Sequence, residues 1–151
     1  MGLQRRSFLK LGVLGACALA AGGAAYRALR GPAAPGRFVL DGAARAALAA
    51  IVPAMLGEAL PHGGDARSKA LDGAIAGVDT AIRGLPLSAQ QEVQDLFGLL
   101  ALAPARRFVA GVKDGWPEAD PVQVAAFLQS WRTHRLATLQ TAYLALHDLI
   151  L

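Results

Sequence analysis

Three histidines, His62, His134 and His147, are the side chains in this sequence best suited to chemistry. An imidazole binds metal ions or moves protons near neutral pH. We expect His62 in a loop. His134 and His147 fall thirteen positions apart in one predicted helix, which places them about 220° apart around its axis. Because the three lack a shared face and ligand spacing, we predict no metal site.

Neither the paired carboxylates nor the short sequence motifs indicate that this chain catalyses a reaction. The pairs Asp72/Asp79 and Glu92/Asp95 lie on polar faces of predicted helices, where charges usually serve solvation. The sequence has no Gly-x-Ser-x-Gly nucleophile motif and no Cys-x-x-Cys-His haem motif. We therefore predict a chain that is not an enzyme, with no catalytic residue and no cofactor of its own.

Aromatic and basic residues form one unusual group near the C-terminus, and two interpretations of it are open. In the first, Trp131 and Tyr143 anchor the core and keep their polar tips hydrogen-bonded. In the second, the group forms a partner-binding surface, because aromatic residues and arginine dominate the energies of interfaces. The residues of that predicted surface are Trp116, Trp131, Arg132, Arg135 and Tyr143.

The composition is that of packed helices. Hydrophobic residues make up 54% of the 151 positions and charged residues 17%. Five of the fifteen basic residues and no acidic one lie in residues 1–30, so ten basic residues remain against eleven acidic ones in residues 31–151. This near-neutral remainder has no clustered basic face, so we expect no nucleic-acid partner.

The N-terminal stretch QRRSFLK stands directly before sixteen uncharged residues, 11–26. It resembles the twin-arginine translocation signal, with Gln4 where that signal usually has serine or threonine. The resemblance implies the twin-arginine translocase as a partner and export of a folded protein to the periplasm. The residues that carry the signal are Arg5, Arg6, Phe8, Leu9 and Lys10.

Three fates of this leader stay open. Cleavage between Ala25 and Tyr26 would follow the small residues Gly23-Ala24-Ala25. Retention as an inner-membrane anchor is marginal, because sixteen helical residues span about 24 Å of a hydrocarbon core of about 30 Å. Lipidation at Cys17, the single cysteine, fits the preceding Leu-Gly-Ala. The predicted localisation is periplasmic, with anchoring to the inner membrane left open.

Proline, glycine and helix-capping residues mark the boundaries of the predicted domains and helices. We predict a twin-arginine signal or anchor over 1–30, a Pro/Gly linker over 31–40 and a helical domain over 41–151. The fold class is all-α, a small bundle of about five helices preceded by an N-terminal signal or anchor helix. We expect helices over 42–60 and 66–83, a third from Pro86 with Leu102 on its buried side, and others over 104–112 and 121–150.

Capping residues mark the expected starts of these helices. Asp41, Asp65 and Asp120 are predicted N-caps, and Ser88 with Gln91 reads as a capping box. Pro53 falls inside the first helix and is expected to kink it.

Two longer stretches carry a family resemblance. FVLDGAARAALAAIVPAML, with Phe38 and Ile51-Val52-Pro53, resembles the opening of the gluconate 2-dehydrogenase subunit 3 family. FLQSWRTHRLATLQTAYLALHDLI resembles short leader-bearing proteins found beside flavin-dependent alcohol or sugar oxidoreductases. Members of the family usually continue into an aromatic tail, so truncation at Leu151 stays open.

The resemblance implies a function in which this chain itself catalyses no reaction. It implies a non-catalytic exported small subunit that binds a flavin-dependent dehydrogenase lacking its own signal and carries it through the twin-arginine pathway. FAD is then expected in the partner's large subunit. The alternative is a free-standing periplasmic helical protein, tethered to the inner membrane, that binds a small apolar ligand or has a binding function of another kind.

Overall fold

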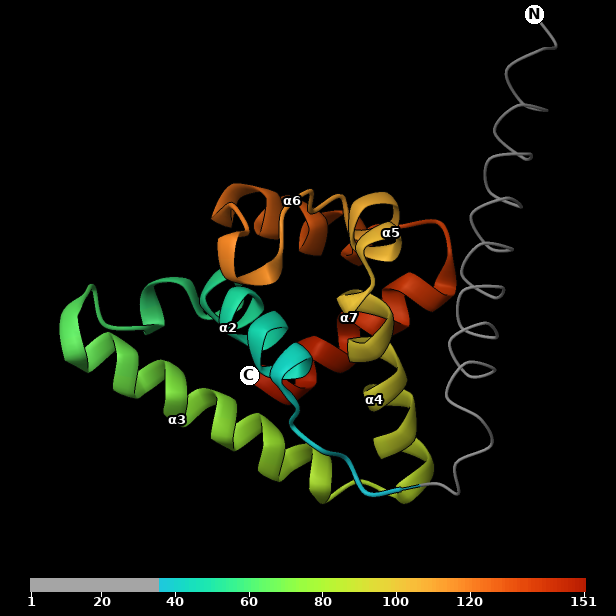
Figure 1. Cartoon of the computed structure of the whole chain (residues 1–151), viewed down its shortest axis with the longest axis horizontal. Helices are drawn as coiled ribbons and strands as arrows, with labels where there is room; N and C mark the ends of the chain where they lie inside the picture. The colour runs from blue at the N-terminus through green and yellow to red at the C-terminus, as the bar shows by residue number, and fades with distance from the viewer. Residues whose placement is uncertain (1–35) are drawn as a thin grey trace, which may run out of the picture. The chain divides into compact units, whose positions relative to one another are not determined.

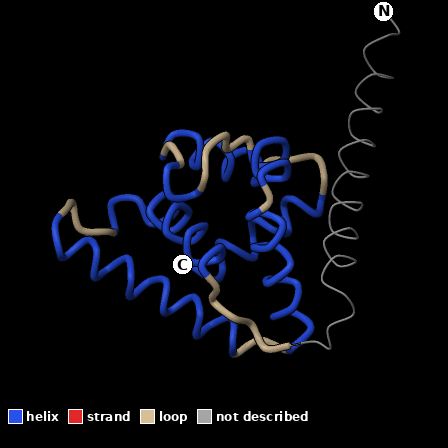
Figure 2. The backbone as a smooth tube through the Cα atoms, viewed as in Figure 1, coloured by secondary structure: helices blue, strands red, loops and turns tan. Residues whose placement is uncertain are grey.

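Every regular element of residues 36–151, the range that the computed structural model describes, is helical (Figure 2). The longer helices are α2 (Gly42–Leu56), α3 (Gly64–Arg83), α4 (Leu87–Ala101), α6 (Pro121–Arg132) and α7 (Ala137–Ile150). Short helical turns are η1 (Gly57–Ala59), α5 (Ala103–Ala105), η2 (Arg106–Ala110) and η3 (Trp116–Glu118). The predicted all-α class and small helical bundle are confirmed.

The helix α2 is the centre of the bundle (Figure 1). It contacts α3, α4, α6, α7 and η3, and its buried side chains are Ala44, Ala47, Leu48, Ile51 and Val52. Asp41 caps it as predicted, because its carboxylate accepts the N–H of Ala44 at 2.8 Å. The helix continues through Pro53 and ends at Leu56, four residues before the expected end.

The helix α3 begins two residues earlier than expected, and its predicted cap is wrong. Gly63 holds the cap position and Asp65 lies inside the first turn. Gly64 has φ 65°, a left-handed conformation that glycine adopts without strain, so the chain enters the helix at the two glycines. Gly84 ends the helix as predicted.

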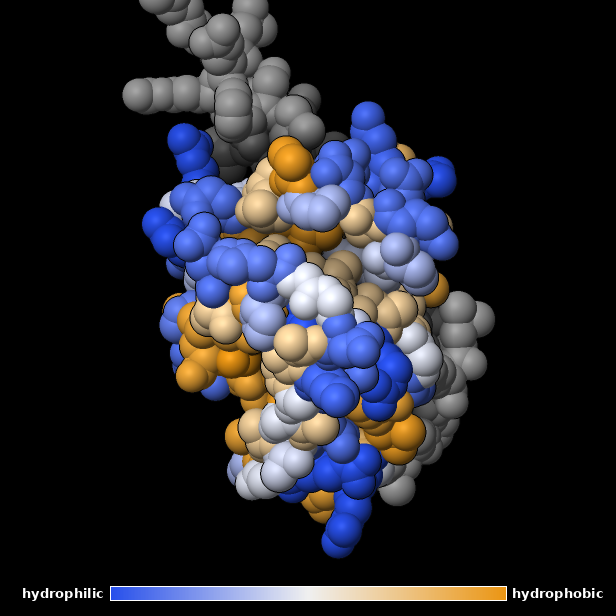
Figure 3. Space-filling view, turned by 90° about the vertical axis from the view of Figure 1, so that its left-hand side faces the viewer, coloured by the Kyte–Doolittle hydropathy of each residue, from blue (hydrophilic) through white to orange (hydrophobic). Residues whose placement is uncertain are grey.

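On the face shown in Figure 3, hydrophilic residues alternate with small hydrophobic areas.

The helix α4 also starts without its predicted capping box. It begins at Leu87, after Pro86, so Ser88 lies in the first turn and no side chain caps the helix. Its buried side is Gln90, Val93, Phe97 and Leu100. Leu102, which we expected on that side, is 41% exposed, because the chain leaves the helix at this residue with an extended backbone.

The short helix predicted over 104–112 takes a wider form. Pro104 lies in its first turn as expected, but the α-helical part ends at Ala105 and the chain continues as the π-helical turn η2. Gly111, with φ 72°, closes that turn, and its N–H donates to the carbonyl oxygen of Arg106. Ala110 and Val112 on either side of Gly111 are buried.

The prediction of a single long helix over 121–150 is wrong. Asp120 caps α6 as predicted, with its carboxylate 2.9 Å from the N–H of Val122, but α6 ends at Arg132 and α7 begins at Ala137. In the turn between them, Nδ1 of His134 accepts the N–H of Leu136 at 3.1 Å. A thirty-residue helix would extend about 45 Å, whereas folding back lets α7 pack against α6, α2 and α3.

The chain divides into two units, and the second, Ala34–Leu151, contains all of the helices above. Phe38 belongs to its core: it is 2% exposed and its ring centroid lies 6.2 Å from that of Phe97. The predicted signal, its cleavage point at Ala25 and Tyr26, and Cys17 lie outside the described residues. Within residues 36–151, Gly42–Ala59 is long and apolar enough to cross a membrane, but as α2 with η1 it is the central helix of the bundle.

Candidate functional site

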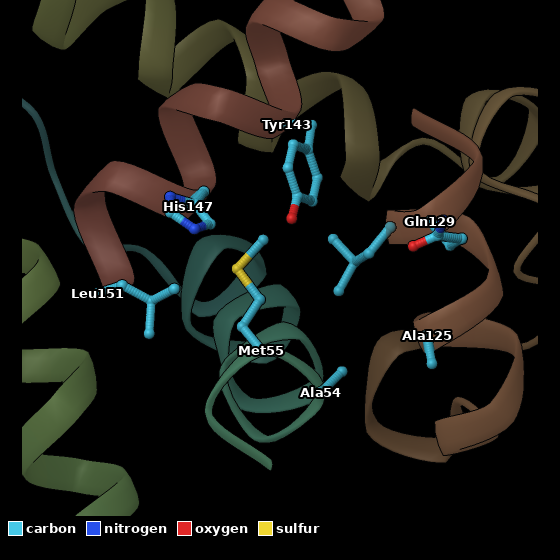
Figure 4. A pocket seen from close by; sticks show the side chains of 8 residues that line it. Ala54, Met55, Ala125, Gln129, Tyr143, His147 and Leu151 are labelled. Atoms are coloured by element: carbon cyan, nitrogen blue, oxygen red, sulfur yellow. The ribbon is translucent and has the colours of Figure 1, made fainter. Parts of the chain in front are cut away.

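A pocket of about 330 Å³ opens between α2, α6 and α7 (Figure 4). It is the candidate site of the described part of the chain. Its lining residues come from these three helices and from the residue after α7, and are Ala54, Met55, Ala125, Leu128, Gln129, Tyr143, His147 and Leu151.

The turn at His134 creates this pocket. Because the chain reverses there, α7 lies against α6, and Tyr143 and His147 face residues of α6 across the pocket (Figure 4). The short side chains of Ala54 and Ala125 leave room between the helices. The hollow therefore arises where small residues of two helices meet a third helix.

The polar groups of the pocket lie around an apolar floor. The rings of Tyr143 and His147, four positions apart on α7, have centroids 5.9 Å apart. The hydroxyl of Tyr143 points into the space above Met55, and the side-chain amide of Gln129 faces it from α6 (Figure 4). Tyr143, Gln129 and His147 thus offer hydrogen-bonding groups to a pocket whose apolar lining includes Met55 and Leu128.

The imidazole of His147 is oriented by its neighbour in the sequence. Its Nδ1 lies 3.1 Å from the carboxylate of Asp148. When Nδ1 donates to that carboxylate, Nε2 of the neutral ring is an acceptor, and in the protonated ring Nε2 is a donor. His147 therefore offers either hydrogen-bonding role to a ligand.

This arrangement is suited to binding a small ligand with an apolar body and a polar end. An engineered apolar cavity of about 150 Å³ holds benzene, so a pocket of about 330 Å³ has room for one ring with substituents. Tyr143, Gln129 and His147 would orient the polar end of such a ligand.

The two tryptophans of the predicted partner surface are core residues instead. Trp131 is 1% exposed and Trp116 is 5% exposed. Their indole N–H groups donate to the carbonyl oxygens of Val109 at 3.2 Å and of Leu100 at 3.0 Å. The surface interpretation is therefore wrong for Trp116 and Trp131, because both rings fill the interior and both polar tips already have partners within it.

The other residues of the predicted surface separate. Arg132 ends α6 and Arg135 lies in the turn after it, and both are exposed. Tyr143 is half-buried and lines the pocket. The structure thus brings Tyr143 together with His147 and Gln129, and it does not assemble the five predicted residues into one exposed face.

The remaining candidates for chemistry are dispersed. His62 is exposed in the loop before α3, as expected, and His134 and His147 belong to a turn and to a helix rather than to one helix. Asp79 pairs with Arg83 at 3.0 Å, and Asp95 accepts a hydrogen bond from Gln91 at 2.9 Å. Within residues 36–151, no three side chains of the metal-binding types gather.

Most of the pocket could not be found from the sequence. The one available signal is the spacing of Tyr143 and His147, which places them on the same face of a helix. Ala54, Met55 and Ala125 carry no such signal, because their role depends on which helices become neighbours.

Comparisons of the chain with protein-family models, with curated proteins and with solved structures find no match.

Proposed function

We propose that this chain is a non-catalytic, exported small subunit that binds a flavin-dependent dehydrogenase lacking its own signal and carries it through the twin-arginine pathway. The observation that carries the proposal is the run Arg5-Arg6-Ser7-Phe8-Leu9-Lys10 directly before the apolar residues 11–26. The family resemblance of the stretches 38–56 and 127–150 adds the class of partner.

The architecture of the domain is compatible with this role. An FAD-loaded partner must be folded before export, and the twin-arginine route accepts folded cargo. A carrier for such cargo needs a folded domain that can hold a partner while a separate leader engages the translocase. Residues 34–151 are a unit with their own helical core, and the leader precedes that unit in the sequence. If the leader is retained, the same chain would hold the enzyme at the inner membrane.

Replacing the twin arginines tests the export step. The Arg5→Lys, Arg6→Lys double variant should leave both this chain and its dehydrogenase in the cytoplasm, since the signal depends on the arginine pair. The matched control is Arg27→Lys with Arg30→Lys, which changes two arginines of the same leader outside the signal. Immunodetection in periplasmic and cytoplasmic fractions gives the result, and normal export of the first variant would overturn the proposal.

Co-purification tests the partner step. We would co-express the tagged full chain with each flavoprotein dehydrogenase that is encoded by a neighbouring gene and lacks its own signal, capture the tag and record a flavin absorbance spectrum. The proposal expects a stoichiometric flavoprotein in the captured fraction. Capture of the chain alone, with active dehydrogenase in the flow-through, would contradict it.

The pocket supports a second candidate function, a free-standing, membrane-tethered periplasmic protein that binds a small ligand. Its lining combines apolar side chains with Tyr143, His147 and Gln129. Phenol is a suitable probe, because it has one ring and one hydroxyl. NMR shift changes at Ala54 and Tyr143 on addition of phenol would favour this function. Ala125→Leu should remove them, whereas Ala126→Leu on the exposed side of α6 should not.

A further inference from the structure

We propose that an exposed surface around Phe108 contacts the anionic face of a lipid bilayer. The Phe108 surface consists of Leu102, Pro104, Arg107, Phe108 and Lys113. Phe108 is 88% exposed, the largest exposed fraction among the large hydrophobic residues of the described chain, and Leu102 is 41% exposed. A phenylalanine so fully exposed buries little apolar area against its own domain, so its ring is available to a surface outside the domain.

The fold itself directs Phe108 outward. The residues after it are held against the core: the carbonyl oxygen of half-buried Val109 accepts the indole N–H of Trp131 at 3.2 Å, and Ala110 is 5% exposed. The π-helical turn η2 widens the backbone at this point and Gly111 closes it. Because that turn is held by core contacts, Phe108 is presented on a firm support; π-turns of this kind often occur at functional sites.

Two exposed cationic residues, Arg107 and Lys113, lie near Phe108 in the sequence. Residues 96–113 contain three basic residues and no acidic one, and the nearest acidic residues that follow are Asp114 and Glu118. The Nε of Arg107 donates to the carbonyl oxygen of Lys113 at 3.0 Å, so the two cationic residues are held next to each other. Arg107 and Lys113 are exposed, as Phe108 is, whereas Arg106 is half-buried, with its Nε in the interior and its Nη1 donating to the carbonyl oxygen of Ala101.

The size of the Phe108 surface favours a bilayer over a protein. A stable protein interface covers about 800 Å² on each partner, which one phenylalanine and a partly exposed leucine do not supply. An aromatic residue flanked by arginine and lysine is instead typical of segments that enter the interface of an anionic membrane. A weak contact of this kind is effective when a tether keeps it near the membrane.

The leader, residues 1–30, would be the tether that keeps the domain near the membrane. The inference rests on the proposed function in this respect, since the leader must bring the domain to the membrane. Phe38, at the start of the domain, lies beside Phe97 of α4, and the Phe108 surface begins at Leu102, directly after α4 ends at Ala101. The fifteen residues of α4 span about 22 Å. Eleven residues, 27–37, separate the apolar run 11–26 from Phe38, and a chain of eleven residues spans at most roughly 36–40 Å, which exceeds the length of α4.

The experiment uses the full chain with Cys17→Ser and with Ala103→Cys, which places an environment-sensitive dye on an exposed residue next to Leu102. The chain is reconstituted into vesicles of phosphatidylcholine, or of phosphatidylcholine and phosphatidylglycerol in equal parts. Dye emission and quenching by acrylamide report contact with the bilayer. A second dye position, Ala126→Cys on exposed α6, is the reference.

We expect the dye at position 103 to shift to the blue and resist quenching in anionic vesicles only, while the dye at position 126 stays accessible. Phe108→Ser should abolish the shift, and Val122→Ser, at a side chain that is 73% exposed, should leave it intact. Arg107→Gln should weaken the contact roughly fivefold, the effect of about one cation at an anionic surface, whereas exposed Arg45→Gln should not.

The alternatives give different results. If the chain joins both kinds of vesicle but the dye at position 103 is equally accessible in each, the leader anchors the chain and the inference about Phe108 is wrong. If the chain joins neither, anchoring fails and the inference fails with it. If the dye stays accessible and Phe108→Ser instead prevents co-purification of the dehydrogenase, the Phe108 surface binds protein, which also overturns the proposal.

Discussion

The side-chain oxygen Oε1 of Gln90 accepts the backbone N–H of Phe38 at 2.9 Å, a bond that joins the first residues of the domain to α4. The amide nitrogen of Gln90 donates to the carbonyl oxygens of Arg83 at 3.1 Å and Leu85 at 2.8 Å. Gln90 is 4% exposed. One buried amide therefore fixes the entry of the chain, the end of α3 and the start of α4 relative to one another.

Gln90→Leu should lower the free energy of unfolding by about 3 kcal/mol, because one buried and two part-buried backbone groups lose a partner that leucine cannot replace. Urea denaturation followed by circular dichroism measures the change. Gln140→Leu, at an exposed position of α7, is the matched control and should stay within about 0.5 kcal/mol of the parent. Equal stabilities of the two variants would show that the Gln90 network is not a strong constraint.

The elements that the sequence predicts well are those with local signals. Asp41 and Asp120 cap the helices that follow them, and Gly84 ends α3, because the groups that satisfy a helix end are close in sequence. Ser88 and Asp65 are also of residue types that favour the N-cap position. In the structure, however, both lie inside the first turn of their helices. Pro86 and Gly63 take the cap positions there, so a suitable residue type alone does not fix where a helix begins.

The features that the sequence does not reveal depend on tertiary contacts. No glycine or proline marks the reversal at His134, since residues 122–150 contain neither. The break is stabilised by an imidazole nitrogen and by packing of α7 on three other helices. The burial of Trp116 and the exposure of Phe108 follow from the path of the chain between α4 and α6, and the pocket at Tyr143 follows from the reversal.

Trp131→Phe should lower the free energy of unfolding by about 2 kcal/mol. The variant loses the hydrogen bond to the carbonyl oxygen of Val109 and part of the indole ring. It keeps an aromatic ring near Phe127, whose centroid lies 4.8 Å from that of Trp131. Hydrogen exchange should show the loss concentrated in η2 and α6, and protection unchanged in both elements would contradict the role given to this bond.

Asp41→Ala and Asp120→Ala should each cost about 1 kcal/mol of stability, the usual effect of removing an N-cap. Their carboxylates accept the N–H groups of Ala44 and Val122. The two caps belong to different helices with no shared partner, so the double variant should show the sum of the two effects. Thermal unfolding of both single variants, the double variant and exposed Asp72→Ala checks this expectation, and a loss as large in Asp72→Ala would refute it.

Replacing His134 tests why the chain reverses between α6 and α7. His134→Ala removes the acceptor of the Leu136 N–H and should destabilise the protein by about 1 kcal/mol. His134→Asn should recover most of that loss, because the oxygen of an asparagine side chain accepts the N–H two residues further on in an Asx turn. Denaturation curves of the parent and both variants measure the difference. If alanine and asparagine destabilise equally, the hydrogen bond does not hold the turn, and packing of α7 against α6 alone accounts for the reversal.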